Sequence, residues 1–197
     1  MRSAIFLDRD GVIIENRSEY VRSWEAVAFI PGALAALAEI ARSAYAIVIV
    51  TNQAGVGKGV ISLAEAEAIN ERIQTEIERV GGRVDGFYLC PHTESDGCEC
   101  RKPKPGMLLA AAHDLNLDLS QAWMIGDAVT DLQAGAAAGA RPLLVLTGRG
   151  TDHKELHGLE GFADLTEALA HIQKQTSNPS APLRTSLKLQ TSNNKLL

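Results

Sequence analysis

Short apolar runs alternate with stretches of helical periodicity along most of this chain. The apolar runs span 4–7, 45–50, 84–89, 122–125 and 142–146. The run at 45–50 is continuous and rich in β-branched residues, which is typical of a strand buried on both faces. The helical patterns span 33–43, 62–80, 106–116, 129–138 and 164–173. Such alternation predicts parallel strands joined by crossover helices, and therefore an open α/β sheet.

The boundaries of the longest helical pattern carry their own signals. Ser62 precedes the first apolar position and Glu65 follows three residues later, a spacing typical of a capping box. The pair Gly81-Gly82 then predicts the end of this helix.

The end of the chain differs from the rest. From about Thr176 it is rich in Ser, Asn, Pro and Gln and has no periodicity. We therefore expect one domain over residues 1–173 and a disordered polar tail over 174–197. The chain has 197 residues, 46% of them hydrophobic, which suits a single domain.

The net charge of the chain and the length of its apolar runs exclude some classes of function. The formal net charge is -5, and residues 174–197 hold four basic and no acidic residues, so the predicted domain is more acidic still. This balance argues against nucleic acid or an anionic membrane as partner. The longest apolar run, 44–50, is too short to span a bilayer, and Asp8 interrupts the only candidate for a signal peptide. We expect a cytoplasmic monomer that acts on a small molecule.

Acidic residues follow two of the predicted strands. Asp8-Arg9-Asp10-Gly11 follows the first, and a turn at Gly11 would let both carboxylates face one site. Asp127 and Asp131 follow the fourth strand, at the start of a helix. A charged loop and ordinary first-turn acids are the alternative interpretations. Acids after two strands are, however, how an α/β sheet assembles a site for a hard cation.

Two further segments contain polar or basic residues near the same predicted edge. Thr51-Asn52-Gln53-Ala54-Gly55 follows the second strand and offers a hydroxyl and backbone N–H groups to a phosphate. Arg101-Lys102-Pro103-Lys104 crowds three cations before a helix, which favours an anion nearby, although a solvated basic turn is the alternative. Gly57-Lys58-Gly59 lacks the residues of a P-loop.

All three cysteines fall within one loop, 90–100, together with a histidine. Cys90, His92, Cys98 and Cys100 supply four ligands of the kind that Zn²⁺ prefers. Reduced thiols, a strained Cys98–Cys100 disulfide or a thiol redox sensor are the alternatives. Four protein ligands leave no open position, so we predict a structural zinc that shapes this loop. Because the loop ends at Arg101 and Lys102, the zinc would also position those cations.

Taken in order, Asp-x-Asp, Thr, Lys and Gly-Asp-x-x-x-Asp resemble the haloacid dehalogenase superfamily of aspartate-nucleophile phosphohydrolases over residues 4–150. The resemblance implies a Rossmann-like three-layer sandwich with a parallel central sheet. Only short segments, 15–28 and the zinc loop, leave the predicted core, so we expect no large cap domain.

The same resemblance implies a role for each polar residue. Asp8 would be the nucleophile, forming an aspartyl-phosphate, and Asp10 the general acid and base. Mg²⁺ would be held by Asp8, the carbonyl oxygen of Asp10 and Asp127. Thr51 and Lys102 would stabilise the phosphoryl oxygens, and Asp131 would support Asp127 or Lys102.

Within the superfamily, the Cys-Pro-His…Cys-x-Cys-Arg-Lys-Pro-Lys-Pro-Gly run is similar to two related groups. These are the D-glycero-D-manno-heptose-1,7-bisphosphate 7-phosphatases, which serve activated-heptose pathways, and the histidinol-phosphatases of histidine biosynthesis. The segments 8–11, 30–32, 51–55 and 146–150 resemble the heptose enzymes more closely. The five-residue spacing between His92 and Cys98 is closer to the histidinol-phosphatase loop, and Ile14 replaces an Asn frequent in heptose enzymes.

The expected substrate is therefore a heptose bisphosphate, with histidinol phosphate as the alternative. By resemblance, the substrate contacts would come from three segments: Asn16, Arg17, Ser18 and Glu19; Thr51, Asn52, Gln53 and Ala54; and Arg101 and Lys102. A non-catalytic, zinc-stabilised module that binds phosphorylated ligands is a third hypothesis, disfavoured because both Asp8 and Asp10 are present.

Overall fold

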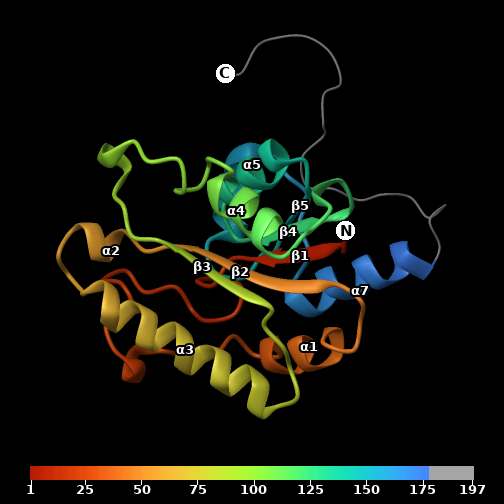
Figure 1. Cartoon of the computed structure of the whole chain (residues 1–197), viewed down its shortest axis with the longest axis horizontal. Coiled ribbons are helices and arrows are strands. Elements are labelled where there is room, and N and C mark those ends of the chain that lie inside the picture. The colour runs from red at the N-terminus through yellow and green to blue at the C-terminus, as the bar shows by residue number, and fades with distance from the viewer. Residues whose placement is uncertain (178–197) are drawn as a thin grey trace, which may run out of the picture.

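Five parallel strands form one central sheet in the computed structural model, which describes residues 1–177. The order across the sheet is β3-β2-β1-β4-β5. The strands are β1 (Ala4–Leu7), β2 (Ala46–Asn52), β3 (Gly86–Cys90), β4 (Trp123–Gly126) and β5 (Arg141–Leu144). Figure 1 shows the sheet between two layers of helices, as predicted for a three-layer α/β sandwich.

The two layers follow from the alternation of side chains along each buried strand. In β1, Ile5 and Leu7 join a core with helices α1 (Ala33–Ile40), α3 (Leu63–Arg79) and α7 (Leu165–Ser177). Ala4 and Phe6 join a second core with α4 (Gly106–Asp114) and α5 (Val129–Ala138). All four side chains are fully buried. A strand covered on both faces must be apolar at every position, which explains the continuous apolar runs of the sequence.

The helices connect these strands and agree with most of the predicted periodicity. They are α1 (Ala33–Ile40), α2 (Ala54–Gly57), α3 (Leu63–Arg79), α4 (Gly106–Asp114), α5 (Val129–Ala138), α6 (Gly150–His157) and α7 (Leu165–Ser177), with the 3-10 helices η1 (Trp24–Ala26), η2 (Glu94–Asp96) and η3 (Leu119–Gln121).

The predicted capping box at the start of α3 is confirmed. Ser62 Oγ accepts from the Glu65 N–H at 3.2 Å, and Glu65 Oε2 accepts from the Ser62 N–H at 2.8 Å.

Three segments differ from the prediction. The short helices α2 and α6 were not predicted, because their polar and glycine-rich sequences lack apolar periodicity. Helix α7 continues to Ser177, beyond the predicted domain end at residue 173, so the start of the predicted tail is helical. Beyond that end, Thr176 Oγ1 lies 3.0 Å from the Ile172 carbonyl and 2.8 Å from the Tyr45 hydroxyl, contacts that hold the last turn of the helix. The rest of the predicted tail lies outside the described residues.

The order of the strands indicates which edge of the sheet can bind a ligand. From β1 the chain adds β2 and then β3 on one side of the sheet, and afterwards β4 and β5 on the other side. The order in which strands are added therefore changes side between β1 and β4, although all strands are parallel. Ligands of open α/β sheets bind at such a switch point, beyond the carboxyl ends of the strands. Within residues 1–177, the segments between β1 and α1 and between β3 and α4 contain only the 3-10 helices η1 and η2 and form no large cap domain. None of the helices there is both long and apolar enough to cross a membrane.

Candidate active site

A tight turn follows β1 and brings both acidic residues of the first motif to one cleft. Gly11 has a φ of 87°, and its N–H donates to the Ile14 carbonyl at 2.6 Å. A Cβ at this position would lie 2.1 Å from Asp127 Oδ2, so only glycine fits. Asp8 and Asp10 both line the cleft, as predicted for a turn at Gly11.

Lys102 forms the centre of a buried ionic network beneath the cleft. Its Nζ lies 2.7 Å from Asp8 Oδ1 and 2.7 Å from Asp131 Oδ1, and it donates to the Val50 carbonyl at 2.9 Å. All three ionic side chains are almost fully buried. The loop after residue 100 therefore supplies a cation to acids from β1 and α5, and Asp131 supports Lys102 as the sequence suggested.

The backbone of Lys102 is fixed by the end of β2. Asn52 Nδ2 donates to the Lys102 carbonyl at 3.0 Å, and the Lys102 N–H donates to Asn52 Oδ1 at 3.1 Å. This paired contact joins two segments that are fifty residues apart.

Asp8, Asp127 and Asp131 form a cluster in which one oxygen from each lies within 4.8 Å of the others. Asp127 Oδ2 accepts from Asn16 Nδ2 at 2.6 Å and from the Arg149 N–H at 2.9 Å. Asp127 Oδ1 is buried and has no hydrogen-bond partner among the described residues. A buried carboxylate oxygen without a partner beside two other carboxylates suits a hard cation such as Mg²⁺. The cluster does not include the carboxylate of Asp10, whose predicted ligand atom is its carbonyl oxygen.

The electrostatics of this cluster are those of a site that needs a cation. Burial raises the pKa of Asp8 to about 7 against the opposing effect of Lys102. Burial and the neighbouring Asp8 raise the pKa of Asp127. Burial alone would lower the pKa of Lys102, but Asp131 and Asp8 raise it overall, so the lysine stays charged. The ionised forms of these buried acids are therefore disfavoured unless a cation binds beside them, while Lys102 keeps its positive charge.

Asp10 is held by donors from three residues. Arg9 Nε lies 3.0 Å from its Oδ2 and Arg9 Nη2 3.0 Å from its Oδ1. Gln53 Nε2 donates to Asp10 Oδ2 at 2.9 Å, and the Thr51 hydroxyl does so at 3.4 Å. Thr51 is fully buried below this contact.

The cleft above these residues has a volume of about 370 Å³. Of the predicted site residues, those that line it are Asp8, Asp10, Asn16, Arg17, Asn52, Gln53, Ala54, Arg101 and Lys102. Ser18 and Glu19 lie outside this lining on the exposed loop, where Glu19 pairs with Arg22. Thr51 and Asp127 are buried next to it.

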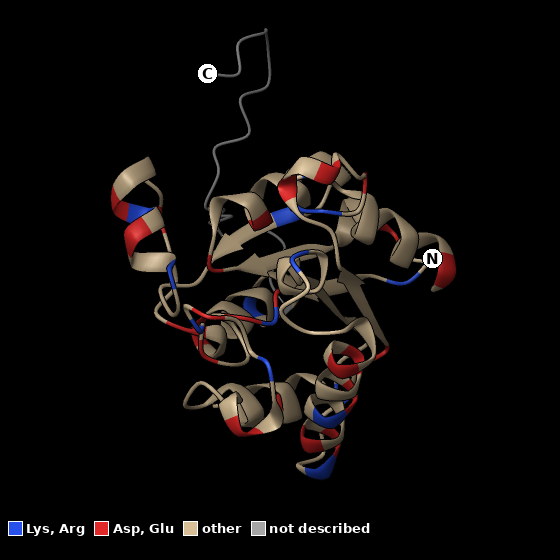
Figure 2. Ribbon diagram, turned by 90° about the vertical axis from the view of Figure 1, so that its left-hand side faces the viewer, with Lys and Arg blue, Asp and Glu red and all other residues tan. Residues whose placement is uncertain are grey.

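Sequence reasoning missed several residues of the cleft. Tyr20, Lys58 and Arg149 also line it. Arg149 follows β5, so the strand-end argument could have found it. Lys58 and Tyr20 carry no such signal; they meet only in the fold, where Lys58 Nζ donates to the Tyr20 hydroxyl at 2.9 Å. Viewed from this edge, Figure 2 shows both basic and acidic segments in the loops that face the viewer.

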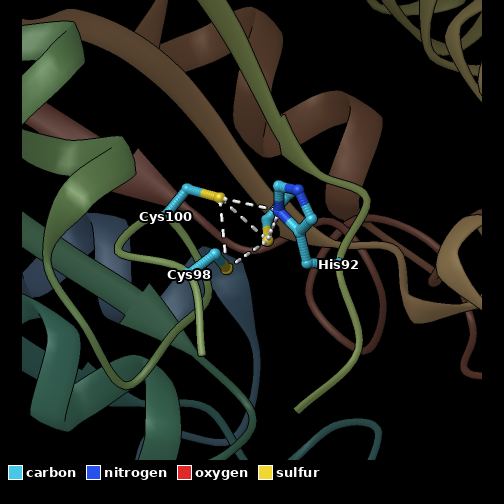
Figure 3. Close-up of side chains that lie close together, drawn as sticks. His92, Cys98 and Cys100 are labelled. Carbon is cyan, nitrogen blue, oxygen red and sulfur yellow. Dashed lines mark hydrogen bonds between the residues drawn. The ribbon is translucent and has the colours of Figure 1, made fainter. Parts of the chain in front are cut away.

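The four predicted zinc ligands are brought together at the side of the cleft. One ligand atom each of Cys90, His92, Cys98 and Cys100 lies within 4.8 Å of the others. Figure 3 shows His92, Cys98 and Cys100 directed toward one another, with His92 Nδ1 3.3 Å from Cys100 Sγ. The cysteines form no disulfide, and the donor set fits tetrahedral Zn²⁺.

The loop that carries these ligands also contacts the first basic residue of the cleft. Arg101 Nη1 donates to the His92 carbonyl at 3.2 Å. The Cys/His cluster is thus linked through one hydrogen bond to a cation of the cleft lining.

Comparisons with known proteins agree with this geometry. A HAD-hydrolase-like family model matches residues 99–170. The D-glycero-beta-D-manno-heptose-1,7-bisphosphate 7-phosphatase of Neisseria meningitidis serogroup A is 34% identical over 183 residues, covering 90% of this chain and 98% of that protein. Its counterpart in Pseudomonas putida is 40% identical over 146 residues, covering 74% of this chain and 83% of that protein.

A solved structure gives the same result. The crystal structure of D,D-heptose 1.7-bisphosphate phosphatase from B. bronchiseptica, complexed with magnesium and phosphate, superposes with a TM-score of 0.83 at 35% identity. It covers 88% of this chain and 99% of that one. The chain belongs to the haloacid dehalogenase-like hydrolases, in the family of the heptose-1,7-bisphosphate 7-phosphatases.

Proposed function

We propose that this protein is a Mg²⁺-dependent phosphatase that removes the 7-phosphate of D-glycero-D-manno-heptose 1,7-bisphosphate. The observation that carries the proposal is the buried group of Asp8, Asp127 and Asp131 around Lys102, at the floor of a cleft lined by Asp10. Relatives that match nearly the whole chain bear the name of this activity.

In the proposed reaction, a carboxylate oxygen of Asp8 attacks phosphorus and the ester P–O bond breaks, giving an aspartyl-phosphate and an alkoxide that Asp10 protonates. A water molecule then attacks the aspartyl-phosphate, Asp10 accepts its proton, and inorganic phosphate leaves. Lys102 neutralises charge on the transferring phosphoryl oxygens. Thr51 lies in the same network through Gln53 and Asp10, and its direct contact with the phosphoryl group stays a prediction.

Mg²⁺ would be held by Asp8, the Asp10 carbonyl and Asp127, and when bound it neutralises negative charge between nucleophile and phosphate. The partnerless Oδ1 of Asp127 supports this assignment. Asn16 and the Arg149 N–H hold the other oxygen of Asp127 and thereby orient it.

A substrate with two phosphates suits the charge of the cleft. Besides Lys102, its lining contains Arg17, Lys58, Arg101 and Arg149. These cations are available to a second, distal phosphate, while Asn16 and Gln53 offer polar groups to the sugar hydroxyls. The side-chain amide of Asn52 is paired with the Lys102 backbone, so its substrate contact stays a prediction. The exposed Ser18 and Glu19 remain predicted substrate contacts of the same loop.

Zn²⁺ bound by Cys90, His92, Cys98 and Cys100 completes the proposal as a structural metal. Burial raises the pKa of Cys90 to about 12, so without a metal this thiol stays protonated. A cation that holds the loop closed would also hold Arg101, whose guanidinium contacts the His92 carbonyl.

The test is phosphate release from three substrates: both anomers of the heptose bisphosphate and histidinol phosphate. We expect turnover of a heptose bisphosphate with Mg²⁺, little turnover of histidinol phosphate, and none with Asp8→Asn. A higher kcat/KM on histidinol phosphate would overturn the substrate assignment. Full activity of Asp8→Asn would overturn the mechanism.

A further inference from the structure

One buried cation next to the active site has no role in the reaction described so far. Arg9 stands between Asp8 and Asp10 in the first motif, yet its side chain is 1% exposed and is not among the residues that line the cleft. A buried guanidinium needs partners for its N–H groups, and these partners show what it does.

Arg9 uses opposite ends of its guanidinium for two different residues. Nε and Nη2 form a fork on the carboxylate of Asp10, each at 3.0 Å. Nη1 donates to Asn70 Oδ1 at 2.7 Å. Asn70 lies in α3 and is itself 5% exposed, so the contact is buried.

The position of Asn70 is unusual for its helix. The other buried residues of α3 are the apolar Ala66, Ile69, Ile73 and Ile77. Asn70 is the polar residue among them, and its side chain accepts a hydrogen bond from the Arg9 guanidinium. Burying an amide costs free energy unless it is hydrogen-bonded, so the contact with Arg9 accounts for an asparagine at this position.

We propose that Asn70 is a positioning residue that acts on Asp10 through Arg9. The inference rests on the proposed function, in which Asp10 protonates the leaving group. Asn70 holds one end of a planar, rigid guanidinium, and the other end fixes both oxygens of Asp10. Without Asn70, Nη1 loses its buried acceptor, the guanidinium turns to find another, and the carboxylate moves with it.

This role predicts a dependence on the leaving group. An alkoxide leaving from a sugar needs a proton, whereas 4-nitrophenolate is stable enough to leave without one. A misplaced Asp10 therefore slows formation of the aspartyl-phosphate from the sugar phosphate and spares the aryl phosphate. Because kcat/KM reports the steps up to formation of that intermediate, it is the quantity to compare.

The experiment compares kcat/KM on heptose bisphosphate and on 4-nitrophenyl phosphate for wild type, Asn70→Leu and Asn70→Asp. General acid catalysis contributes about 10²–10⁴-fold, and a displaced acid loses part of it. We expect Asn70→Leu to lose about 10²-fold on the heptose substrate and about 3-fold or less on the aryl substrate. Asn70→Asp keeps the acceptor for Arg9 and should restore most of the difference.

Thr75→Val is the matched control, because it removes one side-chain hydrogen bond from the same helix, to the Glu71 carbonyl, away from the cleft. It should not change the ratio of the two substrates. If Asn70→Leu does not fold, Asn70→Ala replaces it, with folding followed by circular dichroism. Equal losses on both substrates, no loss on either, or the same selective loss in Thr75→Val would overturn the positioning role. A wild type inactive on both would refute the proposed function itself.

Discussion

The two candidate metal sites at the edge of the sheet differ in burial, donor atoms and completeness. The carboxylates of Asp8, Asp127 and Asp131 are buried and come from β1 and from the segment after β4. The Cys/His cluster comes from the last residue of β3 and the loop that follows it, and only Cys90 of its residues is buried. The first cluster has an oxygen without a partner, whereas the second has four mutually close ligand atoms.

This difference indicates that the carboxylate cluster can take part in a reaction, whereas the Cys/His cluster can only fix the shape of a loop. A site with too few protein ligands leaves positions for phosphate and water, so it can support a reaction. A site with four ligands is closed and can only fix the conformation of the loop. The two clusters are neighbours at the same cleft, because Lys102 follows Cys100 by two residues and its ammonium contacts Asp8 of the carboxylate cluster.

Loss of Asp8, the proposed nucleophile, should give the largest effect and would assign the chemistry to the carboxylate cluster. Asp8→Asn keeps the shape of the side chain but cannot form the aspartyl-phosphate, so we expect kcat to fall by at least about 10³-fold. Phosphate release assays measure this loss. The thermal unfolding midpoint should not fall, because one of three crowded buried acids becomes neutral; a variant that is inactive only because it is unfolded would contradict the assignment.

Removal of the central cation should damage both the reaction and the fold. Lys102→Met leaves Asp8 and Asp131 without their shared partner, and we expect a loss of about 10²–10³-fold in kcat/KM. Buried acids that lose their cation become protonated or repel each other, so the unfolding midpoint should also fall.

The surface pair Lys104–Glu99, two residues away in the chain, supplies the control for this variant. Lys104→Met should leave both activity and unfolding midpoint near those of wild type, since exposed ion pairs contribute little. If Lys104→Met lost as much activity as Lys102→Met, loop charge in general would explain the effect.

Disruption of the second cluster should affect stability more than chemistry. Cys98→Ser removes a predicted zinc ligand, and we expect the unfolding midpoint to fall by about 5 °C or more, measured by calorimetry. Metal analysis should find about one zinc per wild-type chain and less in the variant. Wild-type protein with no zinc and three freely titrating thiols would contradict the structural site. Phosphatase activity that needs only Mg²⁺ in a folded Cys98→Ser variant would sharpen the separation of the two clusters.

The smallest expected effect is the pH dependence of Mg²⁺ binding. Burial raises the pKa of Asp8 from its ordinary 3.8 to about 7, so between these values the metal-free fold holds a proton that the unfolded chain releases. Asp8 therefore stabilises the metal-free fold at low pH, and this contribution is lost as the pH rises through about 7.

Because Mg²⁺ binds the ionised carboxylate, it must displace that proton at low pH. The rise in unfolding midpoint on adding Mg²⁺ should thus be a few degrees larger at about pH 8 than at about pH 5.5. Differential scanning fluorimetry at both pH values checks this, with Asp8→Asn as control, in which the difference should shrink. A rise independent of pH would contradict a metal site that contains Asp8.

The sequence by itself determined the strand order along the chain, the buried helices and the residue types at the strand ends. Apolar runs and helical periodicity are local, and a buried strand must be apolar whatever lies beside it. The spacing of Cys90, His92, Cys98 and Cys100 is equally local, because one short segment of the chain holds all four. These features could be read without knowing how the chain folds back on itself.

The tertiary structure alone decided which distant side chains meet. Nothing in the sequence links Arg9 to Asn70. Helical spacing places Asn70 on the apolar face of α3 with Ala66 and Ile73, but its partner lies sixty-one residues away in the chain. The same holds for Lys58 beside Tyr20 and for Asn16 on Asp127. Local patterns follow from backbone geometry and burial, whereas these contacts depend on the strand order and on how α3 packs against the sheet.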